Sequence, residues 1–211
     1  MGFAYSRAMA RSRGPTTPQP APDPKRADSQ EIVESILTAA IALGPDATTN
    51  AIAERAGVGI ASLYRYFPSP VAIFAEISRR MHRQFLEQLR AITVRPELSL
   101  AGAIREVCRI AVETPGVPVA MRQRLNLDVP LSWTKDSADD TYKTALDAAT
   151  EWLRHHLAAP PADLGERVFV AFSAIRGAVL MAMLYPELAP PSEELIDQLA
   201  ANTLRCLTSS P

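Results

Sequence analysis

The sequence predicts an all-α protein in which a small N-terminal helix-turn-helix unit precedes a larger helical domain. After residue 28, apolar residues recur at the spacing of one helix face. No stretch alternates apolar and polar residues as a half-buried strand would. Prolines and glycines divide the pattern into segments of helix length. The 211 residues, 47% of them hydrophobic and 21% charged, suffice for one small unit and one larger core.

The first 28 residues differ from the rest of the chain. Five prolines lie between Pro15 and Pro24, and apolar periodicity is nearly absent. Such a composition is typical of a disordered arm. The arm has no apolar stretch like that of a signal peptide, and the longest apolar run, residues 178–185, is far too short to span a bilayer. We therefore expect a cytoplasmic protein.

A helix, and then two short helices around a tight turn, are predicted between residues 29 and 68. In the short helices, Ile52 and Ala53 face inward from the first, and Leu63 and Phe67 face inward from the second. Between them Gly57 can take the left-handed backbone that ends a helix without a Cβ penalty. This is the anatomy of a helix-turn-helix, whose second helix lies in the major groove of DNA. The preceding helix presents an apolar face of Ile32, Val33, Ile36, Leu37, Ala39 and Ala40.

The segment from Ser29 to Phe74 resembles the DNA-binding region of the TetR family of bacterial transcriptional regulators. The resemblance rests on the apolar first helix, the IAERAGV run from Ile52 and the SLYRYFP run from Ser62. It implies a homodimer that binds a pseudo-palindromic DNA operator, with a helical ligand-binding and dimerisation domain after the DNA-binding unit. Two features depart from the family. Pro70 stands where a lysine is usual, and the connection at residues 41–47 looks about a turn short.

The DNA contacts are expected from the start of the two short helices and from the outside of the second. Residues 60–62 open that second helix and are best placed to touch base edges. Tyr64 and Tyr66 are expected on its outside or flank, where their hydroxyls can reach phosphates. Thr48 is expected to cap the first short helix, whose N–H groups would face a phosphate. The predicted DNA-binding residues are Thr48, Thr49, Gly59, Ile60, Ala61, Ser62, Tyr64, Arg65 and Tyr66.

The charge pattern favours only a modest attraction to phosphate. The net charge is −1, and residues 48–70 hold one glutamate and two arginines. More positive charge lies in the N-terminal arm and at Arg79, Arg80 and Arg83. The arginines of the arm could enter a minor groove, or the arm could have no role.

The helices after the DNA-binding unit follow from capping residues and apolar spacing. Ser69 can cap a helix with Pro70 in its first position. Apolar residues from Ile73 to Ile92 then trace one face over about six turns, and this helix would connect the two domains. Another helix runs from Leu100 and ends before Pro115.

The rest of the chain alternates proline-rich breaks with helices. Residues 115–135 are expected to be irregular, apart from a short amphipathic piece at residues 121–127. A helix carries the apolar residues from Tyr142 to Leu157. The last two helices are expected at residues 163–185 and 192–207. The first of these is apolar nearly all round, so we expect it to be buried against a second copy of the chain.

A ligand pocket is expected in the larger domain. Aromatic and methionine side chains are typical of such pockets, although each residue alone is equally typical of plain core. Arg176 lies in the apolar helix and needs a partner, for which an Asp or Glu of a neighbouring helix is favoured over an acidic ligand. The pocket residues predicted are Met81, Phe85, Ile104, Met121, Trp133, Tyr142, Trp152, Phe169, Phe172 and Arg176.

Nothing in the sequence indicates an enzyme, a metal site or a cofactor. Adjacent histidines at positions 155 and 156 point to different sides of a helix, and His82 stands alone. Cys108 and Cys206 match no metal or redox spacing and are expected as free thiols, although Cys206 could meet its copy in a dimer.

The sequence therefore predicts a disordered arm at residues 1–28, a DNA-binding domain at 29–74 and an effector-binding and dimerisation domain at 75–208. The expected function is that of a transcriptional repressor released from DNA by a small, mostly apolar ligand. Two alternatives remain. One is a TetR-like DNA-binding protein without ligand control, and the other is an all-helical small-molecule-binding protein or enzyme that kept only the architecture.

Overall fold

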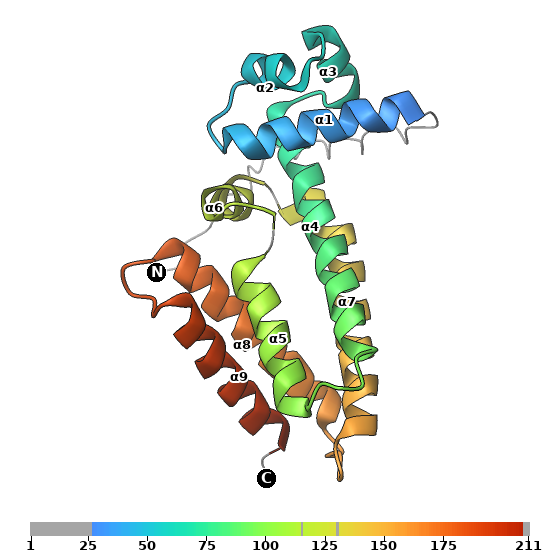
Figure 1. Cartoon of the computed structure of the whole chain (residues 1–211), viewed down its shortest axis with the longest axis vertical. Helices are drawn as coiled ribbons and strands as arrows, with labels where there is room; N and C mark the ends of the chain where they lie inside the picture. The colour runs from blue at the N-terminus through green and yellow to red at the C-terminus, as the bar shows by residue number, and fades with distance from the viewer. Residues whose placement is uncertain (1–26, 115, 130, 209–211) are drawn as a thin grey trace, which may run out of the picture.

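The computed structural model describes residues 27–114, 116–129 and 131–208, without the side chains of residues 27, 28, 131–133, 136 and 137. Within this part of the chain it contains nine α-helices and no strand, which confirms the all-α prediction. The molecule is elongated, with a small head at one end and longer helices below it (Figure 1).

The head is built from α1 (Ala27–Leu43), α2 (Thr49–Ala56), α3 (Ile60–Tyr66) and the first turns of α4 (Pro70–Thr93). The apolar face predicted for the first helix lies in the head core. This helix starts two residues inside the predicted arm, and the rest of the arm lies outside the described residues. It also continues to Leu43, so the connection to α2 begins at Gly44 rather than at residue 41.

Helix α4 joins the head to the lower part of the molecule (Figure 1). Its start is fixed as predicted, because the Ser69 hydroxyl accepts a hydrogen bond from the N–H of Ala72 at 3.2 Å and Pro70 occupies the first turn. Ile73 and Ile77, near its N-terminus, are fully buried in the head core. Farther along, the helix packs against α5 and α7.

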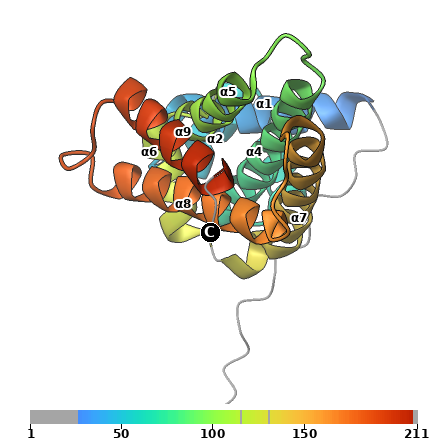
Figure 2. The ribbon, with the colours of Figure 1, turned by 90° about the horizontal axis from the view of Figure 1, so that it is seen from below.

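The lower part contains α5 (Leu100–Glu113), α7 (Leu131–His156), α8 (Leu164–Leu184) and α9 (Ser192–Thr208). Seen from below, α4 and α7 lie on one side, with α5, α8 and α9 on the other (Figure 2). Apolar residues of α5, α7, α8 and α9 form a second core. Across its surface, Arg105 and Arg109 of α5 make ion pairs of 2.8 Å and 2.6 Å with Glu193 of α9.

The short amphipathic piece expected at residues 121–127 is a helix, and the prediction of irregular structure elsewhere in 115–135 is wrong where helices extend beyond that piece. Helix α6 occupies Val119–Asp128, and α7 begins at Leu131. The prolines at positions 118 and 130 precede these helices instead of interrupting them, because proline is tolerated where a helix starts.

Helix α6 lies directly beneath the head (Figure 1). Met121 and Leu125, with exposed fractions of 0% and 6%, belong to the same apolar cluster as the head core. The helix also packs against α4 and α8. The core of the head is therefore completed by a helix from the second half of the chain.

Candidate nucleic-acid interface and interhelical cavity

The turn between α2 and α3 has the geometry that the sequence predicts. The Thr48 hydroxyl accepts a hydrogen bond from the N–H of Ala51 at 3.2 Å and caps α2. At the other end of α2, Gly57 has φ of 68°, in the left-handed region that favours glycine. The N–H of Val58 then donates to the carbonyl of Ala53 at 3.0 Å, so a main-chain hydrogen bond closes the corner.

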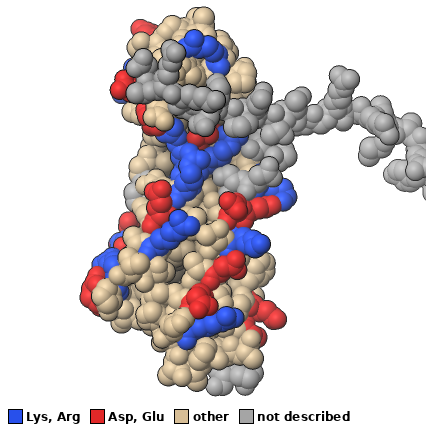
Figure 3. All heavy atoms as spheres, turned by 90° about the vertical axis from the view of Figure 1, so that its right-hand side faces the viewer, with Lys and Arg blue, Asp and Glu red and all other residues tan. Residues whose placement is uncertain are grey.

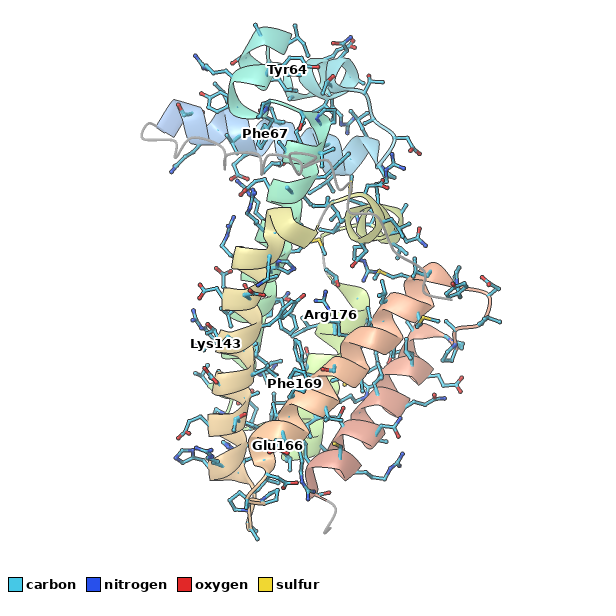
Figure 4. The ribbon with its side chains drawn as sticks, turned by 180° about the vertical axis from the view of Figure 1, so that it is seen from behind. Tyr64, Phe67, Lys143, Glu166, Phe169 and Arg176 are labelled. Atoms are coloured by element: carbon cyan, nitrogen blue, oxygen red, sulfur yellow. The ribbon has the colours of Figure 1, made fainter. Side chains whose placement is uncertain are left out.

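The inner faces of α2 and α3 are buried, and this burial fixes how α3 is presented. Ile52 and Leu63 have no exposed surface, and Phe67 is 1% exposed. On the opposite face, Ile60 is 39% exposed and Tyr64 is 46% exposed. Figure 4 shows Tyr64 at the outer end of the head, away from the rest of the molecule. The outward side of α3 therefore has no role in the core.

The other predicted DNA-contact residues lie around this outward face. Gly59, Ala61 and Arg65 are exposed, and Ser62 is half-buried. The hydroxyls of Tyr64 and Thr49 are 3.1 Å apart, so the start of α2 and the side of α3 are joined by a hydrogen bond. Thr48, Thr49 and the first turns of α3 thus form one continuous surface.

Tyr66 does not lie on the outside, and that prediction is wrong. Its side chain is only 6% exposed and belongs to the head core. Its hydroxyl accepts a hydrogen bond from Nη2 of Arg65 at 3.1 Å, and the Arg65 guanidinium carbon lies 4.9 Å from the centre of its ring. The spacing of Leu63, Tyr66 and Phe67 is that of a single helix face, which is the signal that could have found this burial.

The arginines at the start of α4 are largely neutralised. Arg79, Arg80 and Arg83 make ion pairs with Glu76 at 3.0–3.4 Å, and Arg80 also pairs with Glu34 of α1 at 2.5 Å. On this side of the molecule, basic and acidic side chains alternate below the head (Figure 3). Arg80 thus ties α4 to α1, and the two glutamates offset much of the positive charge of the three arginines.

A cavity of about 190 Å³ lies between α4, α5, α6, α7 and α8. Its apolar wall includes Met81 and Phe85 of α4 and Phe172 of α8. The rings of Phe172 and Tyr142 meet edge to face at 5.6 Å between centres. Among the described residues, the polar groups that line the cavity are Ser78, His82, Gln84, Gln88, Thr114, Arg122, Asn126, Tyr142 and Arg176.

Three basic side chains of this lining lack a carboxylate partner among the described residues. Arg122 is 6% exposed, and its Nη1 donates to the carbonyl of Val112 at 2.8 Å and to the hydroxyl of Thr114 at 3.1 Å. Arg176 places its guanidinium carbon 4.6 Å from the centre of the Tyr142 ring. Burial lowers the pKa of both arginines. Burial, followed by the charge of Arg176, lowers the pKa of His82 to about 4, so its ring is neutral near pH 7.

Of the predicted pocket residues, five line this cavity: Met81, Phe85, Tyr142, Phe172 and Arg176. Ile104 and Trp152 line a second cavity of about 90 Å³ that also includes Phe85 and Phe172. Met121 is instead part of the head core, and Phe169 is 60% exposed on the open face of α8. The side chain of Trp133 lies outside the described residues.

The surroundings of Arg176 differ from the prediction. No ion pair joins Arg176 to a carboxylate of the described residues, and the ring of Tyr142 is its neighbour instead. The Nε2 atom of His82 lies 3.5 Å from the hydroxyl of the same tyrosine. Arg122 was missed altogether, since a single arginine in a short amphipathic helix gives no sign of which way it faces.

Helix α8 carries three large apolar side chains that are exposed. Phe169, Val170 and Met181 are 60%, 56% and 54% exposed. Figure 4 shows Phe169 on the outward side of the helix. By length and composition alone α8 could also cross a membrane, and in the structure it packs against α5, α7 and α9. Its small residues Ala174 and Gly177 lie on the exposed side.

Comparison with known proteins identifies the head. Residues 32–77 match the family model described as bacterial regulatory proteins, tetR family. No curated protein matches the chain.

Solved structures of transcriptional regulators share the fold of most of the chain. A tetR-family transcriptional regulator from Streptomyces coelicolor is 20% identical, with a TM-score of 0.62 over 84% of this chain and 79% of that one. LfrR from Mycobacterium smegmatis, in complex with proflavine, is 17% identical, with a TM-score of 0.57 over 86% and 99%. FadR from Bacillus subtilis, in complex with stearoyl-CoA, is 14% identical, with a TM-score of 0.56 over 85% and 97%.

Proposed function

The chain carries a tetR-family DNA-binding domain on a fold shared with tetR-type regulators, and from that premise we propose that it is a homodimeric transcriptional repressor released from its operator by a small, mostly apolar ligand. The observation that carries the proposal is the presentation of α3. Its inner face is buried in the head, whereas Ile60 and Tyr64 project from its other face without a role in the core. The proposal gives the protein no catalytic activity and retains the domain division at residues 29–74 and 75–208.

The DNA contacts that we propose follow from this surface. Residues 59–62 would meet base edges, because the first turn of a recognition helix enters the major groove. Tyr64 and Thr49, whose hydroxyls are 3.1 Å apart, would contact the phosphate backbone. Arg65 would reach a phosphate or a guanine when it turns from the ring of Tyr66.

A second copy of the chain would cover α8. The exposed side of this helix combines bulky apolar residues with Ala174 and Gly177, which permit close helix approach. A contiguous apolar surface of this kind favours association in water. A two-fold dimer would present two α3 helices and so match a pseudo-palindromic operator.

Ligand control would act through the helices that line the cavity. Helix α4 begins in the head and forms one wall of the cavity, so a change in its tilt would alter the spacing of the two heads. A ligand needs only a difference of about 1–3 kcal/mol in affinity for the two arrangements. The complexes of LfrR with proflavine and of FadR with stearoyl-CoA support ligand binding by proteins of this fold.

Titration of fluorescent DNA from the region upstream of the gene tests the DNA-binding proposal. The unaltered protein should bind one such fragment more tightly than a scrambled fragment at the same salt concentration. Tyr64→Ala should weaken this binding, because the ring projects from α3. Val94→Ala is the matched control, since Val94 is 76% exposed at the far end of α4. Equal affinities for the specific and scrambled DNA would contradict the proposal.

Sedimentation at micromolar concentration tests the dimer. The unaltered protein should show about twice the chain mass without DNA. Phe169→Glu should favour the monomer, because it places a charge within the apolar face. Val94→Glu places the same charge at an exposed site on the loop after α4 and should leave the dimer intact. A monomeric unaltered protein would remove the basis for a palindromic operator.

Two other functions fit the same fold. A DNA-binding protein without ligand control would bind its operator but show no ligand in native mass spectrometry. A small-molecule-binding protein or enzyme would bind a ligand and fail the DNA titration.

A further inference from the structure

The charge in the larger cavity is one-sided. Its described lining includes two arginines and a histidine but no aspartate or glutamate. By contrast, the arginines near the start of α4 and along α5 pair with glutamates. Arg122 is buried, whereas Arg176 is more exposed, and a buried positive charge without a counter-charge is costly. An anion that enters the cavity would supply the negative counter-charge that the described lining lacks.

Arg122 is the more enclosed of the two arginines, which carry the charge of the lining because His82 is neutral near pH 7. Its Nη1 is held by the carbonyl of Val112 and the hydroxyl of Thr114, at the end of α5. Its Nε, which is also buried, has no hydrogen-bond partner in the structure. Because a buried N–H is nearly always satisfied, this atom is a donor that a bound group could use.

Arg176 and the neutral ring of His82 add two further hydrogen-bonding groups on the other side of the cavity. Arg176 lies over the ring of Tyr142, and His82 lies beside the same ring, 5.5 Å between centres. The Nδ1 atom of His82 is buried and has no hydrogen-bond partner. Figure 4 shows Arg176 on α8, in the region that faces α4 and α7. The cavity therefore has unpaired hydrogen-bonding groups on α4 and α6 and an unbalanced charge on α8.

The second cavity is of the opposite character. Among its described lining residues, only Thr93 and Thr203 carry a side-chain hydroxyl, and none is charged. Phe85, Phe172 and Ile175 line both cavities, so the two are adjacent. The rings of Phe85 and Phe172 meet edge to face at 6.0 Å between centres. Rotation of either ring would join a basic compartment to an apolar one.

We propose that the ligand of this protein is an amphipathic organic anion, such as a carboxylate with an apolar body. Its anionic group is balanced by Arg122 and Arg176, and its apolar body packs on Phe85 and Phe172 and extends toward the second cavity. This inference rests on the proposed function, in which a mostly apolar ligand binds between these helices, and it adds the charge of that ligand. A cationic ligand is excluded by the same lining, because it would meet two arginines and no described carboxylate.

Isothermal titration of the full-length protein with charge-matched probes tests the inference. The probes are octanoate and 2-naphthylacetate, each compared with the alcohol and the amine of the same skeleton. At least one carboxylate should bind with one site per chain and about tenfold more tightly than its alcohol, as a charge-assisted hydrogen bond predicts. The amine should not bind. Equal binding of a carboxylate and its alcohol, or tighter binding of the amine, would overturn the inference.

Two variants distinguish an anion bound in the cavity from an anion attracted to positive charge on the protein surface. Arg176→Gln should weaken carboxylate binding about tenfold and leave binding of the alcohol unchanged. Arg124→Gln removes the same charge from an exposed site on α6, where Arg124 pairs with Asp128, and should change neither. Arg122 is a poorer test, since it also holds the end of α5. Equal losses in both variants would mean that the carboxylates bind only to the surface.

A change in the second cavity tests the direction of the apolar body. Ala149 lines this cavity and is half-buried, so Ala149→Leu should fill part of it. Octanoate should lose affinity in this variant, whereas butanoate should bind as before. If both bind unchanged, the apolar body does not extend toward the second cavity.

The DNA titration on the same preparation keeps the two proposals apart. DNA binding without preference for any carboxylate would overturn only the ligand class. Carboxylate binding without DNA binding would overturn the proposed function and leave the ligand class standing.

Discussion

The two tyrosines of α3 should respond to truncation in opposite ways. Tyr66→Ala removes a ring that is 6% exposed and belongs to the head core. Truncation of a buried aromatic residue costs about 3–5 kcal/mol. Because small domains are stable by only about 5–15 kcal/mol, this variant should lose a large part of its free energy of unfolding. Tyr64→Ala, at a site 46% exposed, should lose less than about 1 kcal/mol.

DNA affinity should be lowered by the truncation of Tyr64, the variant that keeps its stability. Tyr64→Ala should keep its fold and lose about 1–2 kcal/mol of DNA binding per contact, as expected for a hydroxyl on a phosphate. Tyr66→Phe keeps the ring and removes only the hydroxyl that accepts from Arg65. If the hydroxyl of Tyr66 also contacts DNA, as the sequence predicts, this variant should weaken DNA binding as well.

Urea unfolding of the three variants, followed by circular dichroism, provides the stability measurement. Tyr66→Ala should have the lowest midpoint, with Tyr66→Phe between it and the unaltered protein. Equal midpoints for Tyr66→Ala and Tyr64→Ala would refute the reasoning, because they would show that burial in the head core does not distinguish these side chains.

Three further predictions concern the rest of the chain. Pro70→Lys should strengthen DNA binding and make the slope of log K against log salt more negative by about 1–2. Position 70 is exposed beside α3, and Ser69 would still cap the helix. Parallel salt plots for the two proteins would show that position 70 does not face a phosphate. Burial and the charge of Arg176 hold the pKa of His82 at about 4. The free energy of unfolding should therefore fall as the pH drops from 7 to 4, because the unfolded chain binds the proton at a higher pH than the folded chain does. The loss should approach about 3 kcal/mol at pH 4, and His82→Gln should remove it in thermal melts measured across this range. Cys108, fully buried with its pKa raised to about 11, should resist iodoacetamide in the native protein, and rapid labelling there, measured by mass spectrometry, would contradict its burial.

The head could be predicted from the sequence because its determinants are local. A cap at Thr48, a left-handed Gly57 and apolar pairs on α2 and α3 lie within about twenty residues of one another. The error at Tyr66 arose within the same stretch. Its hydroxyl suggested a surface role, but its spacing from Leu63 placed it on the inner face.

The cavity could be predicted only in part because it is assembled from five helices. Aromatic character identified Phe85, Tyr142 and Phe172, since large apolar side chains line most cavities of a helical domain. The same rule placed Phe169 in the pocket, although its side chain is 60% exposed on α8. Arg122 could not be assigned without knowing where α6 packs.

The position of α6 determines where mutations that abolish DNA binding should occur along the gene. Met121 and Leu125 lie 28 and 32 residues beyond Thr93, the last residue of α4, yet they complete the core of the head. A substitution at either site would disturb the packing of the head core and so distort the DNA-binding surface, although neither residue belongs to that surface. A genetic screen for lost operator binding should therefore recover two separate clusters of mutations along the gene, one at the helix-turn-helix and one at α6.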